Sequence, residues 1–165
     1  MEQAVTISER ELFAEVLERE FRSCSRMLRA FPTDRLDERA SDCACSAREL
    51  AARFVERERA MHQVLFGAAG AGPPPGASLY EIQCRLEATH ERTLAGLVAL
   101  TEAGWRETVP APAGLGIWDR ARRGELLWLA LKDLIRDDAH FALHLRLARQ
   151  RGTEAYDRFE SLIEG

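Results

Sequence analysis

The longest uninterrupted helical pattern in the sequence runs from Gly124 to Arg151, with no glycine or proline inside it. Its apolar residues recur at helical spacing, so they share one face of a helix. They are Leu127, Leu131, Leu134, Phe141 and Leu145. The pattern predicts a long amphipathic helix whose apolar face must be covered by other helices.

Three earlier segments show the same periodicity. The first can be capped by Thr6 or Ser8 and runs to about Phe31. The second begins at Ser46, which forms a capping box with Glu49. The expected ranges are about 8–31, 46–66 and 79–103. Together with the last segment they predict a four-helix bundle.

The link at residues 67–78, GAAGAGPPPGAS, is dominated by glycine and proline and cannot hold a helix or a strand. It is longer than a tight antiparallel connection needs. Such a link can travel the length of a bundle, so the second and third helices can run in the same direction.

The later links are shorter or more ordered. Gly104 and Trp105 should end the third helix, and residues 106–123 should form an ordered crossover or flap in which Trp118 packs on the bundle. The tail after Gly152 predicts a fifth helical segment. Because no segment alternates apolar and polar residues, the sequence predicts an all-α fold in a single domain, residues 1–165.

Composition and motifs exclude several classes. A net charge of -4 without a basic patch argues against a nucleic-acid-binding module. No apolar run approaches about 20 residues and no signal peptide is apparent, so we expect a cytoplasmic protein that does not bind a membrane. Cys24, Cys43, Cys45 and Cys84 lack zinc-ribbon spacing and are expected to be free thiols. Nucleophile-elbow, phosphate-loop and dinucleotide motifs are missing.

Three stretches carry a resemblance to the DinB-like family. SARELAARFVERE (46–58) is similar to the family's second helix, AFPTDRLDERASD (30–42) to its first loop, and LLWLALKDLIRDDAHFALHLR (126–146) to its fourth helix. The resemblance implies a bundle with up-down-down-up topology and a long crossover between helices 2 and 3. It also implies a divalent metal, which many members bind through three histidines.

The resemblance places the metal ligands on the second and fourth helices. The family's second-helix histidine, in the phrase SxxELxxH, matches Arg53. On the fourth helix two registers are open. Matching the flanking tryptophan-leucine run puts the ligands at Asp133 and Asp137, whereas reading HxxxH directly puts them at His140 and His144. In either register the three-histidine site is incomplete.

The same four residues form one stripe on the long helix, because spacings of four, three and four return to the same side. Two imidazoles one turn apart, at His140 and His144, can reach a single Zn²⁺ or Ni²⁺. The candidates for a further ligand are Asp137, His62 and His90. The alternative is that the stripe is a solvated flank of the helix.

A second ligand pattern extends over all four helices and matches the ligand set of di-iron carboxylate bundles. It consists of Glu20, Glu58, the pair Glu87-x-x-His90 and the pair Asp137-x-x-His140. Glu58 and His90 lie on the buried stripes of their helices, which is unusual for such groups. The alternative is that these groups are semi-buried and paired with arginines such as Arg53 or Arg57.

Two functions remain open. In the first, which the resemblance implies, zinc or nickel lowers the pKa of a bound thiol in a metal-dependent thiol transferase or hydrolase-like enzyme. The metal ligands would be His140, His144 and Asp137, and Glu58 or His90 could act as a base.

In the second, the metal site is degenerate, because Arg53 repels a cation and pairs with Asp133 and Asp137. The protein would then be a non-catalytic small-ligand-binding or structural module. Its pocket would include Arg53, Glu58, His62 and His90. A homodimer is expected in either case, to cover an apolar surface formed by Leu126, Leu129 and Leu143.

Overall fold

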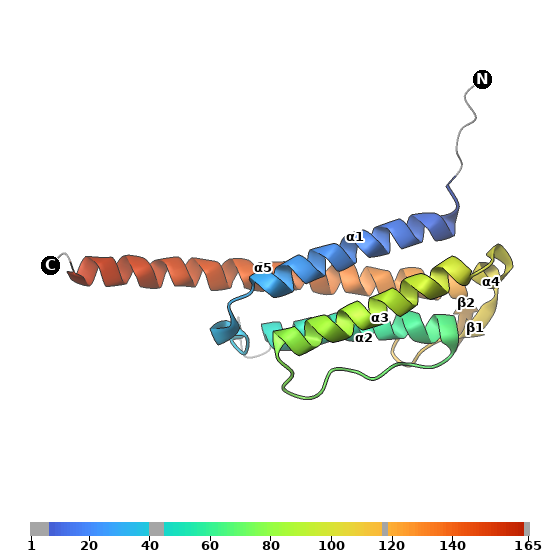
Figure 1. Cartoon of the computed structure of the whole chain (residues 1–165), viewed down its shortest axis with the longest axis horizontal. Coiled ribbons are helices and arrows are strands. Elements are labelled where there is room, and N and C mark those ends of the chain that lie inside the picture. The colour runs from blue at the N-terminus through green and yellow to red at the C-terminus, as the bar shows by residue number, and fades with distance from the viewer. Residues whose placement is uncertain (1–6, 40–44, 117–118, 164–165) are drawn as a thin grey trace, which may run out of the picture.

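The computed structural model describes residues 7–39, 45–116 and 119–163, with side chains as far as residue 150. The elements are α1 (Glu9–Ala30), the 3-10 turn η1 (Thr33–Arg35), α2 (Ala47–Phe66), α3 (Leu79–Ala99), α4 (Glu102–Arg106), β1 (Thr108–Pro110), β2 (Arg120–Arg122) and α5 (Arg123–Ile163). The four long helices form a bundle (Figure 1).

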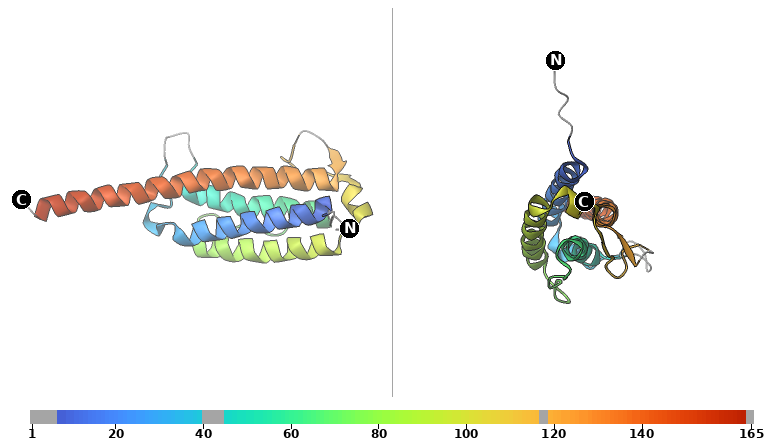
Figure 2. Two further views of the ribbon diagram at one scale, coloured as in Figure 1. Left: turned by 90° about the horizontal axis from the view of Figure 1, so that it is seen from above. Right: turned by 90° about the vertical axis from the view of Figure 1, so that its right-hand side faces the viewer.

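Helices α1 and α5 run in one direction, and α2 and α3 run in the opposite direction (Figures 1 and 2). Both α1 and α2 pack against α3 and against α5, so the order around the bundle is α1, α3, α2, α5. The link between α2 and α3 travels back along the bundle. The expected up-down-down-up topology is therefore confirmed, and the C-terminal turns of α5 extend beyond the other helices.

Serine-x-x-glutamate capping boxes begin three of the long helices. Ser8, Ser46 and Ser78 each accept a hydrogen bond from the backbone N–H of the glutamate three residues later. That glutamate's carboxylate accepts one from the serine's own N–H, so both backbone donors are satisfied. At the other end of α2, Gly67 adopts the left-handed φ of 76° that few residues other than glycine tolerate.

A cluster of aromatic residues joins the start of α1 to α4 and α5. The Glu9 carboxylate accepts hydrogen bonds from the indole N–H of Trp105, at 3.2 Å, and of Trp128, at 3.0 Å. Phe13 packs against both indoles, with ring centroids 5.6 and 5.1 Å away. Gly124 allows this packing, because a Cβ there would lie 2.5 Å from the Trp105 ring.

The third long helix is shorter than predicted. It ends at Ala99, and Leu100 adopts an extended conformation. The Thr101 hydroxyl then accepts from the backbone N–H of Gly104 and caps the separate helix α4. The expectation of one helix to Ala103 is therefore wrong, because a threonine cap breaks it earlier.

The segment between α4 and α5 contains a small antiparallel pair, in which Val109 of β1 is opposite Ala121 of β2. Strands of three residues are too short to show an alternating pattern, so the sequence did not predict them. Helix α5 continues through Gly152 to Ile163, where a separate fifth segment had been expected. The predicted packing of Trp118 falls outside the described residues.

The predicted apolar face of α5 is buried in the core, with Leu127 and Phe141 at 0% exposure. Leu126 is also fully buried, so it cannot belong to the predicted dimer surface, whereas Leu143 is 54% exposed. Leu129 is partly buried against the core. None of the helices in the described ranges combines the length and apolar character needed to cross a membrane.

Candidate functional site

The four polar residues that were predicted to share a stripe of α5, Asp133, Asp137, His140 and His144, differ in their exposure to solvent. Asp137 is completely buried and Asp133 is half-buried, and both face α2. His140 is exposed, and His144 is half-buried near the end of the bundle. The four residues predicted to share a stripe therefore lie in three different environments.

The two aspartates pair with arginines of α2. Arg57 Nε donates to Asp137 Oδ2 at 2.9 Å, and Arg57 Nη1 lies 3.5 Å from Asp133 Oδ2. Arg53 Nη1 lies 3.8 Å from Asp137 Oδ1, so the predicted pairing of Arg53 with an aspartate is present but is weaker than that of Arg57. These residues, Arg53, Arg57, Asp133 and Asp137, are termed the α2–α5 network.

The α2–α5 network contains the residues at which one of the two registers of the family resemblance places a metal. A divalent cation bound to Asp137 would have to displace the Arg57 guanidinium and would face Arg53 and Arg57, which repel it. Arg136 adds a third guanidinium, 3.1 Å from Asp133 Oδ1. Within the ranges that the structure describes, His, Cys, Asp and Glu side chains form no group of three or more able to hold a metal ion.

The other predicted ligands lie away from this network. Burial and the neighbouring His140 lower the pKa of His144, so its imidazole tends to be neutral near pH 7. His62 Nδ1 lies 3.0 Å from the backbone oxygen of Ala68, after the end of α2. Neither His62 nor Arg53 is among the residues that line the pocket of His90.

The interior of the bundle holds a carboxylate-imidazole pair. His90 Nδ1 of α3 lies 2.8 Å from Glu58 Oε1 of α2, and the two side chains are only 4% and 0% exposed. The partner of Glu58 is thus a histidine, where the sequence suggested Arg53 or Arg57. Among the described residues, Glu58 Oε2 and His90 Nε2 have no hydrogen-bond partner, which is uncommon for buried polar atoms.

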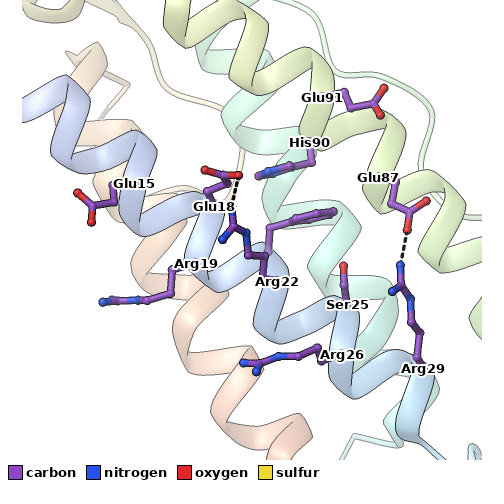
Figure 3. A pocket seen from close by; sticks show the side chains of 11 residues that line it. Glu15, Glu18, Arg19, Arg22, Ser25, Arg26, Arg29, Glu87, His90 and Glu91 are labelled. Atoms are coloured by element: carbon purple, nitrogen blue, oxygen red, sulfur yellow. Dashed lines mark hydrogen bonds and ion pairs between the residues drawn. The ribbon is translucent and has the colours of Figure 1, made fainter.

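His90 also lines a groove of about 770 Å³ between α1 and α3, which is termed the α1–α3 groove (Figure 3). Its floor includes Phe21, whose ring stacks on the His90 imidazole with centroids 3.8 Å apart, and Ser25, which is 6% exposed. The Ser25 hydroxyl has no hydrogen-bond partner in the described part of the chain. The charged lining residues are Glu15, Glu18, Arg19, Arg22, Arg26, Arg29, Glu87 and Glu91.

Sequence reasoning missed a further carboxylate between α1 and α5, the half-buried Asp138. Its oxygens accept hydrogen bonds from Cys24 Sγ at 3.3 Å and from Ser23 Oγ at 3.1 Å. Burial raises the pKa of Asp138, and burial together with Asp138 raises the pKa of the nearby Glu20. The signal was present in the sequence, because Asp138 follows Leu134 by one helical turn and so continues the apolar face.

The residues of the di-iron pattern are distributed over separate sites. Glu58 and His90 meet, but Glu87 pairs with Arg29 at 3.2 Å on the surface. Glu20 lies 3.6 Å from Arg19, and Asp137 belongs to the α2–α5 network. The structure therefore does not assemble these groups around one position.

The fold resembles that of a protein of known structure. The crystal structure of a DinB-like protein, YjoA, from Bacillus subtilis superimposes with a TM-score of 0.66 at 15% sequence identity, over 86% of this chain and 92% of that one. The chain therefore has a DinB-like fold. No family model and no curated protein matches the sequence.

Proposed function

We propose that this protein is a metal-independent, non-catalytic bundle that binds a small molecule, and that its metal site has been replaced by an arginine-aspartate network. The hydrogen bond of 2.9 Å between Arg57 and the buried Asp137 carries this proposal. A guanidinium compensates the charge of the carboxylate in the way that a cation would otherwise do.

The sequence relationship supports the same conclusion. Arg53 stands where the family resemblance expects a histidine, and it approaches Asp137 from the same face of α2 as Arg57. Buried carboxylates need a partner, since leaving one unpaired costs several kcal/mol. The network supplies this partner from within the chain, because Arg57 bonds Oδ2 and Arg53 compensates the charge at Oδ1, which accepts no hydrogen bond in the described residues.

Ligand binding is inferred from the α1–α3 groove. Its volume of about 770 Å³ lies within the range typical of small-molecule sites. Two side chains on its floor, Ser25 and His90, carry buried polar atoms without hydrogen-bond partners in the described ranges. A ligand that reaches these atoms would satisfy them, which favours binding over an empty groove.

The first experiment measures metal content by mass spectrometry on tag-free protein that has been incubated with excess Zn²⁺ or Ni²⁺ and desalted. We expect substoichiometric metal and a thermal unfolding midpoint that neither ion raises, because an ion that binds only the folded state stabilises it. The His140→Ala/His144→Ala variant shows whether any bound metal depends on the two imidazoles that lie one turn apart on α5.

One metal ion per chain that is lost in this double variant would overturn the metal-independent proposal. A small-fragment screen by ligand-observed NMR separately tests the proposal that the protein binds a small molecule. We expect fragments to bind the wild-type protein without added metal. If no fragment binds the folded protein, the ligand-binding proposal is wrong even when no metal is found.

The second candidate function is a metal-dependent thiol transferase or hydrolase-like enzyme. It is favoured by one observation, the position of His140 and His144 one turn apart on α5, from which two imidazoles can reach one ion. The metal measurement above decides between the two candidates. The predicted homodimer stays a prediction for sedimentation measurements in either case.

A further inference from the structure

We infer that the α1–α3 groove binds a small aromatic carboxylate that also carries a hydroxyl group. In this arrangement the hydroxyl binds His90, the ring packs beside Phe21, and the carboxylate binds Ser25 and the arginines next to it. The inference rests on the proposed ligand-binding function and specifies its site and ligand class.

The Glu58–His90 pair determines which ligand group can reach the imidazole. A carboxylate can only accept a hydrogen bond, so its contact with His90 places a proton on Nδ1, 2.8 Å from Glu58 Oε1. The other nitrogen, Nε2, accepts a hydrogen bond when the imidazole is neutral and donates one when the imidazole is protonated. Because Nε2 is buried and has no partner in the described residues, a ligand hydroxyl group, which can donate or accept, suits it in either form.

The opposite part of the groove is suited to an anion. Ser25 lies three residues after Arg22 and four before Arg29, so the three side chains share one face of α1. Arg22 pairs with Glu18 at 2.6 Å, and Arg29 pairs with Glu87 at 3.2 Å (Figure 3). Both arginines are 69% exposed, and such pairs are weak, so the guanidinium N–H groups that these pairs do not use can bind a carboxylate.

Charge is unevenly distributed along the groove. Glu15 lies about 15 Å from Ser25 along the axis of α1, at the end that precedes the arginines. The C-terminal half of α1 contributes Arg22, Arg26 and Arg29 to the lining. Glu87, which pairs with Arg29, and Glu91 line the groove from α3, so it is the arginines of α1 that direct the ligand carboxylate toward Ser25 and Arg29.

An aromatic ring suits the space between these two ends. Phe21 is partly buried, and its ring lies nearly parallel to the His90 imidazole, with 5° between the planes. The stacked rings of Phe21 and His90 form a flat edge on the floor of the groove. A planar ring can pack beside this edge while its two substituents reach His90 and Ser25.

The test is isothermal titration of the full-length, tag-free protein with 4-hydroxybenzoate, benzoate and phenol. We expect 4-hydroxybenzoate to bind most tightly. Benzoate, which lacks the hydroxyl, and phenol, which lacks the carboxylate, should each bind about tenfold more weakly, since one hydrogen bond changes an affinity by about tenfold. Equal affinity for all three probes would overturn the assignment of the two polar ends.

Two variants test the end of the groove that is expected to bind the ligand carboxylate. Ser25→Ala removes a hydroxyl that has no partner in the described structure, so folding should be unaffected, and Arg29→Gln removes one charge. Each variant should lower the affinity for 4-hydroxybenzoate and for benzoate about three- to tenfold and leave the affinity for phenol unchanged. The control Arg92→Gln removes an exposed arginine of α3 outside the groove and should change none of the three affinities.

These outcomes separate the inference from the function on which it rests. If Ser25→Ala and Arg29→Gln bind 4-hydroxybenzoate as the wild type does, or if fragments bind only elsewhere on the molecule, the groove assignment is wrong and the ligand-binding function stands. If neither the probes nor any screened fragment binds the folded protein, both are wrong.

Discussion

Arg57 of α2 donates from Nε to Oδ2 of Asp137 on α5 at 2.9 Å, and the aspartate side chain is 1% exposed while that of the arginine is 23% exposed. Among the described residues it is the shortest of the ion pairs that join α2 to α5. A carboxylate with so little access to water depends on its partner, so the bond couples the packing of α2 to that of α5.

We therefore expect Arg57→Met to destabilise the protein by about 2 kcal/mol, since Arg53 is then the one ion-pair partner of the buried carboxylate among the described residues. The loss should be smaller than for a fully buried pair, because Arg57 is partly solvated. Chemical denaturation of the single variant and of Arg57→Met/Asp137→Leu measures it. The double variant should recover most of the loss, and a double variant as unstable as the single one would contradict this interpretation.

The half-buried Glu20, close to the charge of Asp138, predicts an unusual pH dependence of stability. Because the folded-state pKa of Glu20 is raised above its usual value of 4.5, the folded protein binds more protons than the unfolded chain above that pH. The stability that Glu20 contributes is thus fully present below pH 4.5 and is lost as pH rises through the folded-state pKa. Glu20→Gln should therefore stabilise the protein at pH 7 and have little effect at pH 4.

Denaturation curves at the two pH values test this expectation. Glu15→Gln provides a matched control, because it removes the same charge from an exposed position on α1. It should shift stability less than Glu20→Gln at pH 7. An equal shift for both variants would show that overall charge, and not burial beside Asp138, causes the effect.

The cysteines should differ in reactivity. Burial and the nearby Asp138 raise the pKa of the Cys24 thiol, so little thiolate forms, whereas Cys84 of α3 is exposed. With iodoacetamide at pH 8, peptide mapping should find Cys84 alkylated in the native protein and Cys24 alkylated only after unfolding. Rapid native labelling of Cys24 would mean that α1 separates from α5 far more readily than its packing implies.

Much of the architecture was predictable from local sequence signals. The box of Ser46 and Glu49 defined the start of α2, and the glycine- and proline-rich link predicted the parallel direction of α2 and α3. These signals depend on neighbouring residues only. The break at Thr101 was missed because one threonine cap carries less information than a glycine or a proline.

Pairing across helices was harder to predict. The helical spacing placed Arg53 and Arg57 on one face of α2, but only the helix positions show that Arg57 makes the close contact with Asp137. The sequence likewise indicated that Glu58 and His90 are buried, without showing that they bond to each other. Such partners are set by the rotation and separation of packed helices, which periodicity does not specify.

The proposed replacement of a metal site by arginines can be tested by reversing it. In Arg53→His/Arg57→Gln both repelling guanidiniums of α2 are removed, and an imidazole is placed near the carboxylates of Asp133 and Asp137. We expect this variant to take up about one Zn²⁺ per chain and to be stabilised by added zinc, since one imidazole and two carboxylates suit that ion. Elemental analysis and thermal unfolding measure both effects, with Arg57→Gln alone as the control for the loss of charge. If the double variant folds but binds no more zinc than this control, the α2–α5 network does not occupy a former metal position.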